Sequence, residues 1–305
     1  MKKIIRLIKD PFLIYSILVH KYIKNNAHFL SDKCYLTLLY IASFRKFPNW
    51  KNPQTFNEKL QWLKLYNRNP LYSTLVDKYE VKRYVAKKIG EEYIIPTLGV
   101  WDSFEDIDFN SLPNQFVLKC THDSGGLVIV KDKSNLDVNA AKEKIEKSLK
   151  RNFFWQGREW PYKNVKPRII AEKYMSDIDD TQLTDYKVHN FNGIPKVILV
   201  CRDRYSESGL TEDFYNVKWE HLDITRPGHA QSLTITECPK ELDEILRLSK
   251  LLAKDIPFVR SDFYIINGKE YFGELTFFPA SGMKPFEPKE WDYKLGSWIE
   301  LPSKR

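Results

Sequence analysis

Two acidic residues near the carboxyl end of the chain have the type and setting of metal ligands. Asp262 and Glu274 lie in runs rich in aromatic and β-branched residues that flank Asn267-Gly268, a strong signal for a β-hairpin. Side chains alternate across a strand, so one polar face is expected to hold Arg260, Asp262, Glu274 and Thr276. Carboxylate oxygens are ligands that Mg²⁺ prefers, and the pair therefore indicates a magnesium site. The structural alternative is a solvated hairpin face with an Arg-carboxylate pair.

The register of this hairpin decides whether the two carboxylates meet. A two-residue loop at Asn267-Gly268 would turn Asp262 away from Glu274, because a one-residue slip moves side chains to the other face. We therefore expect a three-residue loop, Ile266 to Gly268, with Gly268 left-handed in a G1 bulge. The opposite face is expected to be buried and to hold Val259, Phe263, Ile265, Tyr271, Leu275 and Phe277.

A second stretch with chemistry-bearing residues covers residues 115–130. It predicts a strand, a polar loop and another strand, and Lys119 alternates with apolar neighbours, so it points away from the apolar face. Ser124-Gly125-Gly126 has no bulky side chains and can bring backbone N–H groups close to phosphate oxygens. Such loops are often plain turns, and the chain contains no Walker pattern and no GxGxxG motif.

The elements around these stretches are predicted as a mixture of helices and strands. Residues 1–70 are expected to be helical, with a capping box of Thr55 and Glu58 at the start of one helix. Residues 168–175 predict a strand that runs into a polar loop. The carboxyl-terminal half is expected to be a set of antiparallel strands with a helix over residues 239–254 against them. The predicted fold class is α+β.

Charge is distributed unevenly along the 305 residues. A hydrophobic content of 43%, a mean hydropathy of -0.46 and a net charge of +8 are typical of a soluble globular protein. Residues 1–88 hold 18 Lys/Arg against 5 Asp/Glu, whereas the remainder holds 30 against 35. This asymmetry predicts an anionic partner, which would be a membrane surface, a nucleic acid, or a phosphorylated or uronic-acid substrate.

The cysteines and the amino terminus bear on the compartment. The four cysteines are far apart and form no CxxC pair: Cys34, Cys120, Cys201 and Cys238. Neither a disulfide framework nor a zinc site is therefore expected, and this favours a reducing cytoplasm. The apolar run over residues 12–19 is too short to span a bilayer, and no small-residue cleavage site follows it. A basic helix on an anionic membrane face and a helix packed on the domain both stay open.

In chain order, these residues resemble the ATP-grasp superfamily and, within it, the TupA-like branch associated with teichuronopeptide, capsule and other cell-surface polysaccharide biosynthesis. The residues typical of the superfamily are Lys78, Lys119 with its Ser-Gly-Gly loop, residues 172–175, Lys187, Asp262 and Glu274. The phrases typical of the branch are residues 52–64, Asp77-Lys78, Gly99-Val-Trp101 and Gly273-Glu-Leu-Thr276. The resemblance covers roughly residues 30–300.

The resemblance implies an ATP-grasp fold, in which a small lid sheet and a larger mixed or antiparallel carboxyl-terminal sheet with flanking helices clamp a nucleotide. The implied subdivision is a basic helical region at residues 1–50, an amino-terminal subdomain at 51–112, a lid subdomain at 113–165 and a carboxyl-terminal subdomain at 166–305. ATP and Mg²⁺ are the implied cofactors.

The resemblance also implies which residues would hold the nucleotide. Lys78 and Lys119 would reach the α- and β-phosphates, under a lid loop that includes His122, Ser124, Gly125 and Gly126. The hinge whose backbone reads the adenine edge would be Glu172, Lys173, Tyr174 and Met175. Asp180 or Asp185 would hold the ribose.

The remaining implied roles concern the reacting groups. Lys187 would face the γ-phosphate, and Asp262 and Glu274 would hold Mg²⁺ ions between the β- and γ-phosphates. Many superfamily members have Asn two residues after this Glu, where this chain has Thr276, so the number of metals stays open. Candidates for binding the acceptor carboxylate are Arg260, Arg202 and Arg204, because Arg matches a carboxylate bidentately; structural ion pairs are the alternative.

The implied activity is ATP-dependent carboxylate-amine ligation through an acylphosphate. The expected substrates are a uronic-acid-type carboxylate on a surface polysaccharide or its precursor and an amino acid or amino sugar. We expect a cytoplasmic protein without a nucleic-acid partner, and contact with an anionic membrane stays open. The oligomeric state is not predicted.

Two other functions stay open at the level of sequence. A metal-dependent glycosyltransferase would use a DxD pattern, which occurs at Asp106-Ile107-Asp108 and at Asp177-Ile178-Asp179. A nucleotide-binding module or phosphotransferase would keep the ATP site and perform no ligation.

Overall fold

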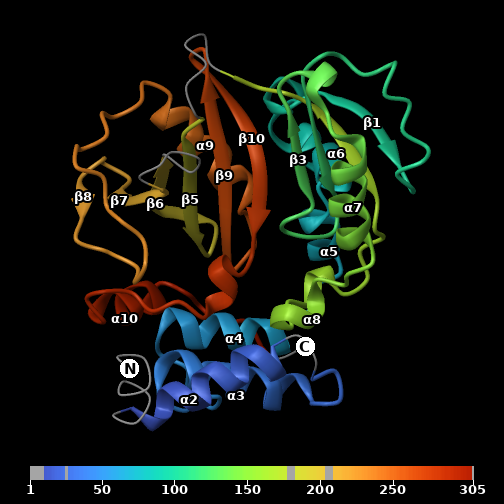
Figure 1. Ribbon diagram of the computed structural model, residues 1–305. Helices are drawn as coiled ribbons and strands as arrows, with labels where there is room; N and C mark the ends of the chain where they lie inside the picture. The colour runs from blue at the N-terminus through green and yellow to red at the C-terminus, as the bar shows by residue number, and fades with distance from the viewer. Residues whose placement is uncertain (1–9, 25–26, 177–182, 203–208, 304–305) are drawn as a thin grey trace.

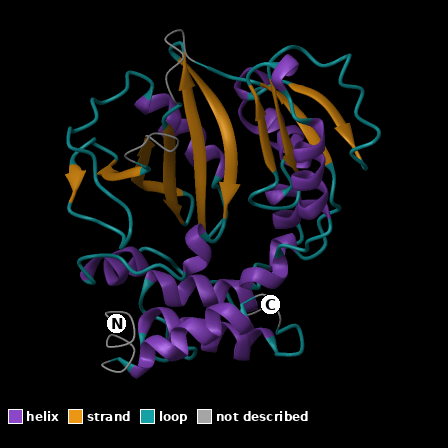
Figure 2. Ribbon diagram, viewed as in Figure 1, coloured by secondary structure: helices purple, strands orange, loops and turns teal. Residues whose placement is uncertain are grey.

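The computed structural model describes residues 10–24, 27–176, 183–202 and 209–303. These residues form two β-sheets that stand side by side above a layer of amino-terminal helices (Figure 1, Figure 2). Within this part of the chain, no helix is long and apolar enough to cross a membrane.

The amino-terminal layer is helical, as predicted. It contains α2 (Pro11–Leu18), a π-helical turn η1 (Val19–Ile23), α3 (Asp32–Phe44) and α4 (Phe56–Tyr66). The predicted capping box is confirmed, because the Thr55 side chain accepts from the backbone N–H of Glu58 and the Glu58 carboxylate accepts from that of Thr55. α4 lies directly beneath the sheets and packs against α10 (Glu290–Ser297).

The other helices lie beside the sheets. They are α5 (Leu71–Val76), α6 (Glu80–Ile89), α7 (Val138–Leu149), α8 (Phe154–Gly157) and α9 (Leu242–Leu252). Short 3₁₀ turns occur at Glu91–Tyr93, Lys133–Asn135, Trp160–Tyr162 and Pro279–Gly282.

The small sheet has the antiparallel order β1-β4-β2-β3. Its strands are β1 (Thr97–Trp101), β4 (Ile169–Lys173), β2 (Phe116–Cys120) and β3 (Leu127–Val130). Burial alternates along β2 as predicted, so Phe116, Leu118 and Cys120 face the α7 side while Lys119 faces away. The sheet includes β1 and β4, which lie outside the range of residues 113–165 predicted for the lid.

The large sheet has the antiparallel order β10-β9-β5-β6-β7-β8. Its strands are β5 (Asp185–Phe191), β6 (Ile194–Arg202), β7 (Thr211–Asn216), β8 (His221–Leu222), β9 (Phe258–Ile266) and β10 (Lys269–Thr276). α9 covers one face through Ile245, Leu248 and Leu252, whose three- and four-residue spacing makes one apolar stripe. The predicted α+β class, with antiparallel strands and a helix against them, is confirmed.

The β9-β10 hairpin brings its carboxylates together by an unexpected device. Asn267, with φ 52°, and Gly268, with φ 71°, form a two-residue loop between the paired Ile266 and Lys269, as in a type I′ turn. The predicted three-residue loop is therefore wrong. A bulge at Gly273 then shifts the register by one residue, so that Asp262 pairs with Glu274 after all.

The position of the bulge also changes the buried face of β10. Before the bulge, Tyr271 pairs with Tyr264 on the polar face, and Phe272 is buried in its place. The prediction for Tyr271 is wrong for this reason. Val259, Phe263, Leu275 and Phe277 are buried as predicted, and Ile265 is partly buried against the same core.

Replacement of Gly268 by Ala tests the turn. A side chain at a left-handed position is strained, so Gly268→Ala should lower the free energy of unfolding by about 1 kcal/mol in urea denaturation. Lys269→Ala is the control, because the neighbouring Lys269 is exposed and has an ordinary φ. Equal stability of the two variants would contradict the type I′ turn.

Candidate active site

A cleft of about 770 Å³ lies between the small and the large sheet. Its walls come from β2, β3 and β4 on one side and from β5, β9 and β10 on the other (Figure 1). The fold brings these predicted residues together as its lining: Lys78, Lys119, Ser124, Gly125, Gly126, Glu172, Lys173, Tyr174, Met175, Asp185, Lys187, Asp262 and Glu274.

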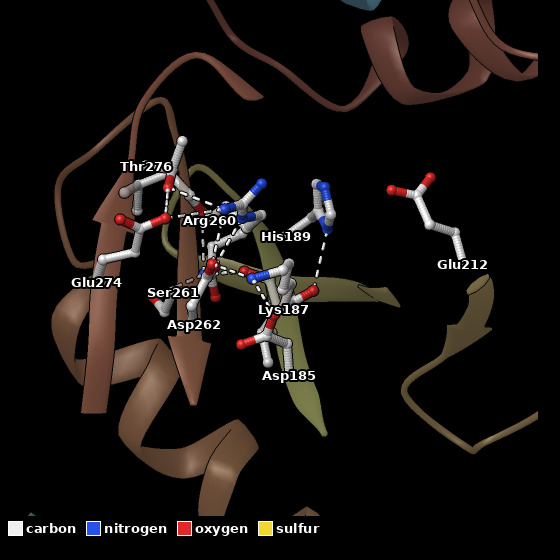
Figure 3. A network of polar contacts seen from close by, with 12 residues as sticks. Asp185, Lys187, His189, Glu212, Arg260, Ser261, Asp262, Glu274 and Thr276 are labelled. Carbon is white, nitrogen blue, oxygen red and sulfur yellow. Dashed lines mark hydrogen bonds and ion pairs between the residues drawn. The ribbon is translucent and has the colours of Figure 1, made fainter. Parts of the chain in front are cut away.

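The strand register arranges polar side chains in rows across the large sheet. Lys187 of β5 pairs with Asp262 of β9, which pairs with Glu274 of β10. The next row along the sheet holds His189, Arg260 and Thr276. Figure 3 shows Arg260 and Lys187 directed at the Asp262 carboxylate, with Glu274 and Thr276 beside Arg260.

Asp262 is buried, and two cations neutralise it. Arg260 donates from Nε to Oδ1 at 2.6 Å and from a terminal nitrogen to Oδ2 at 2.6 Å, and Lys187 Nζ donates to Oδ2 at 2.6 Å. Burial alone would raise the pKa of Asp262, but Arg260 and Lys187 outweigh burial and lower that pKa to about 2. Burial likewise opposes the charge of Lys187, yet Asp262 raises the Lys187 pKa. The cluster is therefore fully ionised at neutral pH.

Glu274 is the accessible carboxylate of the pair. Its side chain is 45% exposed and accepts from Arg260 at 3.3 Å and from the Thr276 hydroxyl at 3.2 Å. Arg260 also donates to the Thr276 hydroxyl at 3.1 Å. The guanidinium of Arg260 thus joins both carboxylates and the hydroxyl, as in the Arg-carboxylate arrangement that the sequence left open.

Asp262, Glu274 and Thr276 fit Mg²⁺ only together with a phosphorylated ligand. Mg²⁺ is usually bound by one or two carboxylates and takes its remaining ligands from water and phosphate. Among the described residues, there is no group of three or more His, Cys, Asp or Glu side chains that could hold a metal by themselves. The donor set therefore suits an ion that arrives with phosphate groups.

Glu172 organises the opposite wall of the cleft. Its buried carboxylate accepts from Lys82 Nζ at 2.5 Å and from Lys119 Nζ at 2.5 Å. Burial would raise the pKa of Glu172, but the ion pairs with Lys119 and Lys82 outweigh burial and lower it. The side chain of Glu172 thus holds two lysines, whereas the sequence suggested only a backbone role. Sequence reasoning missed Lys82, which lies on α6 and outside the cleft lining.

Hydrogen bonds to Asp123 fix the glycine-rich loop between β2 and β3. Lys78 Nζ donates to the backbone carbonyl of Asp123, and the Asp123 carboxylate accepts from Ser148 and Arg151. His122 is buried, and its Nε2 lies 3.2 Å from the carbonyl of Ser148. His122 does not line the cleft; it ties the loop to the end of α7.

Backbone conformation explains one of the two glycines in this loop, and packing explains the other. Gly125 has φ 124°, a backbone conformation that side-chain-bearing residues rarely adopt. A Cβ at Gly126 would lie 2.4 Å from Ser148 Oγ. Ser124 and both glycines line the cleft, so their backbone is accessible to a ligand there.

Lys64 of α4 is a buried cation that the sequence did not reveal as part of the site. Its Nζ donates to the carbonyl of Gly157 at 2.8 Å and to that of Ser281 at 2.9 Å. Burial lowers the pKa of Lys64 to about 8. Lys64 thus fixes the 3₁₀ turn Pro279–Gly282, which follows β10, to α4.

Several predicted residues lie elsewhere. Arg202 follows Cys201, which pairs with Asp185, so Arg202 points to the face opposite the cleft and forms an ion pair with Asp213 at 3.3 Å. Thr276 contacts Glu274 but is not part of the cleft lining. Arg204 and Asp180 lie outside the described residues.

The DxD patterns do not contribute to the cleft within the described chain. Asp106 accepts from Ser103 at 2.8 Å, and Asp108 accepts from the backbone N–H of Asn110 at 3.0 Å. Both aspartates are exposed on a loop of the small sheet, away from the cleft lining. Asp177-Ile178-Asp179 lies outside the described residues.

Apolar residues complete the cleft on the side of the small sheet. They are Ile95, Val117, Leu127, Ile129 and Leu183, and Met175 continues this surface. An apolar wall next to lysines suits a ligand with a flat ring at one end and anionic groups at the other. Sequence reasoning missed these residues because an apolar strand residue is ordinarily part of a core.

The comparisons with known proteins point to one family. A family model described as TupA-like ATPgrasp matches residues 58–300. The comparison with curated proteins gave no match.

Solved structures with a similar arrangement include three ligases. D-alanine–D-alanine ligase from Bacillus anthracis complexed with ATP is 18% identical, with a TM-score of 0.41 over 69% of this chain and 57% of that chain. The enzyme of the same name from Helicobacter pylori is 16% identical, with a TM-score of 0.40 over 80% and 69%. The ATP-grasp ligase PsnB complexed with minimal precursor, Mg and ADP is 11% identical, with a TM-score of 0.40 over 72% and 57%. This chain thus spans less than two thirds of the Bacillus anthracis and PsnB chains.

His189, beside Arg260, generates a prediction about pH. Burial, together with Arg260 and Arg226, lowers the pKa of His189 to about 3. An unfolded His has a pKa of about 6.5, so below this pH the unfolded chain binds a proton that the folded chain does not, and stability falls as the pH drops. Between pH 6 and pH 5, the unfolding free energy of the wild type should therefore fall by about 1 kcal/mol more than that of His189→Phe.

The measurement is urea denaturation of wild type and variant at both pH values. His20→Phe, at an exposed position of η1, is the control and should follow the wild-type profile. Parallel profiles of wild type and His189→Phe would show that His189 does not stay neutral in the folded chain.

Proposed function

The chain belongs to the TupA-like ATP-grasp family, and from this premise we propose that it is an ATP-dependent carboxylate-amine ligase. One observation carries the proposal: lysines of the small sheet and carboxylates of the large sheet line the same cleft, with Lys119 on one wall and Glu274 on the other. A nucleoside triphosphate and its metal need this combination of cations and carboxylates.

The lining of the cleft supports one orientation of ATP. The apolar surface of Val117 and Ile129, together with the hinge at Tyr174 and Met175, would take the adenine. Asp185, farther along the cleft, would hold the ribose. The triphosphate would then lie beneath the loop at residues 124–126, where backbone N–H groups and the lysines can reach its oxygens.

Lys78 and Lys119 have different partners in the protein. Lys78 is fixed to the Asp123 carbonyl, and Lys119 is held by Glu172, which it shares with Lys82. Lys82 and Lys119 carry two positive charges and Glu172 carries one negative charge, so this group has a net charge of +1. This excess charge would attract a phosphate group without any rearrangement of the wall.

Mg²⁺ would be held by Glu274, Asp262 and phosphate oxygens. When bound, it would neutralise charge on the β- and γ-phosphates. Arg260 fixes the orientation of both carboxylates, and Lys187, between Asp185 and Asp262, would add positive charge for the γ-phosphoryl group.

The proposed reaction has two steps. A carboxylate oxygen of the acceptor attacks the γ-phosphorus, the bond to the β-phosphate oxygen breaks, and ADP leaves. An amine then attacks the carbonyl carbon of the acylphosphate, phosphate leaves, and the amine loses a proton as the amide forms. The protein would supply position and compensating charge for a step in which two anions meet.

We extend the proposal to the substrate class. The TupA-like family is associated with cell-surface polysaccharide biosynthesis, which supports a uronic-acid-type carboxylate as acceptor and an amino acid or amino sugar as amine. Of the three candidate arginines, Arg260 contacts the proposed metal ligands Asp262 and Glu274 and the Thr276 hydroxyl, although it is not part of the cleft lining.

Lys119→Ala tests the nucleotide site. Loss of one charge-assisted contact to phosphate is worth about 1.5–3 kcal/mol, so the Kd for ATP should rise roughly 10- to 100-fold. Calorimetry with Mg²⁺ and ATP measures this change. Lys144→Ala, on the exposed side of α7, is the control and should bind as wild type does. An unchanged Kd for Lys119→Ala would remove Lys119 from the phosphate site.

Glu274→Gln tests the proposed activity itself. ADP release with Mg²⁺, ATP and panels of uronic acids and amino acids should fall on the order of 100-fold, while ATP still binds. Glu270→Gln, on the same strand before the bulge, is the matched control and should keep wild-type turnover. Wild-type turnover of Glu274→Gln, or turnover of a nucleotide sugar without ATP, would reject the proposal.

Asp262→Asn is a less specific variant for this purpose. It leaves Arg260 and Lys187 buried without their common partner, which costs about 3–5 kcal/mol. A loss of turnover in that variant would therefore combine lost chemistry with lost stability. The half-exposed Glu274 avoids this confusion.

A further inference from the structure

The net charge of the chain is concentrated in its first 51 residues. Residues 1–51 hold 10 Lys/Arg against 2 Asp/Glu, which gives +8, whereas residues 52–305 hold 38 of each. Both acids of this region are already paired: Asp10 with Arg45, and Asp32 with Arg68 and Arg158. Of the ten cations, Lys2, Lys3, Arg6 and Lys9 lie outside the described residues, and the other six lie on or next to the amino-terminal helices at one end of the molecule (Figure 1).

α2 presents an apolar stripe at its exposed side. Ile14 is 45% exposed, Ile17 46% and Leu18 48%, and their three- and four-residue spacing places them on one helix face. The opposite side of the helix packs on α3 through Tyr15 and the buried Val19. Single exposed apolar residues are ordinary, but a contiguous stripe on one helix indicates a contact surface.

Cations and further apolar groups adjoin this stripe. Lys21 and Lys24 follow on η1 and at its end, and both are exposed. Phe47, 76% exposed, closes an apolar groove between α2 and α3 that Phe12 and Ile41 also line. Arg45 lies 5.0 Å from the centre of the Phe12 ring. The two lysines thus continue the stripe along the chain, whereas the groove lies on the side of α2 that faces α3.

We propose that the surface formed by this stripe of α2 and the lysines at η1 docks on an anionic lipid bilayer. An amphipathic helix lies in a membrane interface when its apolar side can enter the boundary between headgroups and acyl chains and lysines can reach the headgroup phosphates. The stripe at Ile14, Ile17 and Leu18 supplies the apolar side, and Lys21 and Lys24 supply the charge. A nucleic acid would leave the apolar stripe exposed, which favours lipid.

Docking in this way leaves the cleft accessible. α2 contacts α3, α3 contacts α4, and α4 contacts the turn after β10. Figure 1 shows α4 between α2 and the two sheets, whose strands line the cleft, and the stripe lies on the side of α2 opposite its contact with α3. The inference rests on residues that take no part in the proposed reaction, so it can fail or hold independently of ligase activity.

Vesicle co-sedimentation tests the proposal. The full chain should bind vesicles of phosphatidylglycerol and phosphatidylcholine, but not vesicles of phosphatidylcholine alone, and added salt should weaken the binding. Ile17→Asp with Leu18→Asp should reduce the fraction bound on the order of tenfold or more, and so should Lys21→Glu with Lys24→Glu. These side chains are exposed, so the variants should keep the wild-type fold and ADP release in solution.

Matched variants on α9 provide the control. Leu251 is 40% exposed and Lys250 is exposed, so Leu251→Asp with Lys250→Glu makes the same chemical changes on another helix and should leave binding unchanged. Equal binding to both kinds of vesicle, or binding that survives the α2 variants, would overturn the proposal. So would a preference for duplex DNA over the vesicles, or a dimer that the Ile17 and Leu18 changes dissociate.

Discussion

The site depends on a buried carboxylate that is held between two cations. Asp262 cannot stay ionised in the interior without compensation, and Arg260 and Lys187 provide it from the same strand and from the neighbouring strand. This arrangement requires β5 and β9 to pair in one register, and it requires the bulge at Gly273 to bring Glu274 alongside. The interaction thus links the topology of the large sheet to its chemistry.

The wall formed by the small sheet repeats the arrangement, again with a buried carboxylate between two cations. Glu172 is a buried anion between Lys82 and Lys119, and the ion pairs keep both lysines directed at the cleft wall. Each wall is therefore organised before a ligand arrives. A triphosphate and its metal would meet positive charge on one side and carboxylates on the other, which is the pre-organisation that phosphoryl transfer requires.

Local sequence patterns predicted the helices and strands better than the register of the β9-β10 hairpin. Strand alternation placed Lys119 correctly because it follows from residue type and spacing, whereas the common cleft was implied by the resemblance to the ATP-grasp superfamily. The Asn-Gly signal predicted the hairpin but not the bulge, since the bulge at Gly273 lies five residues beyond Gly268, where Phe272 enters the core.

The other differences between expected and observed positions have a similar origin. His122 is polar and close to the glycine loop in sequence, but the fold directs it towards the end of α7. Arg202 lies near Asp185 across two strands, yet alternation along β6 turns it to the other face. Lys64 and Lys82 come from helices whose contacts with the sheets cannot be inferred from spacing within one segment.

The central claim is that a carboxylate attacks ATP in this cleft to form an acylphosphate. The most direct measurement uses an acceptor that supports ADP release, labelled in its carboxylate with the heavy isotope of oxygen, and determines the isotope content of the released phosphate by mass spectrometry. Ligation through an acylphosphate predicts that one carboxylate oxygen is transferred to each phosphate. Unlabelled phosphate, with ADP formed at the same rate, would contradict the account.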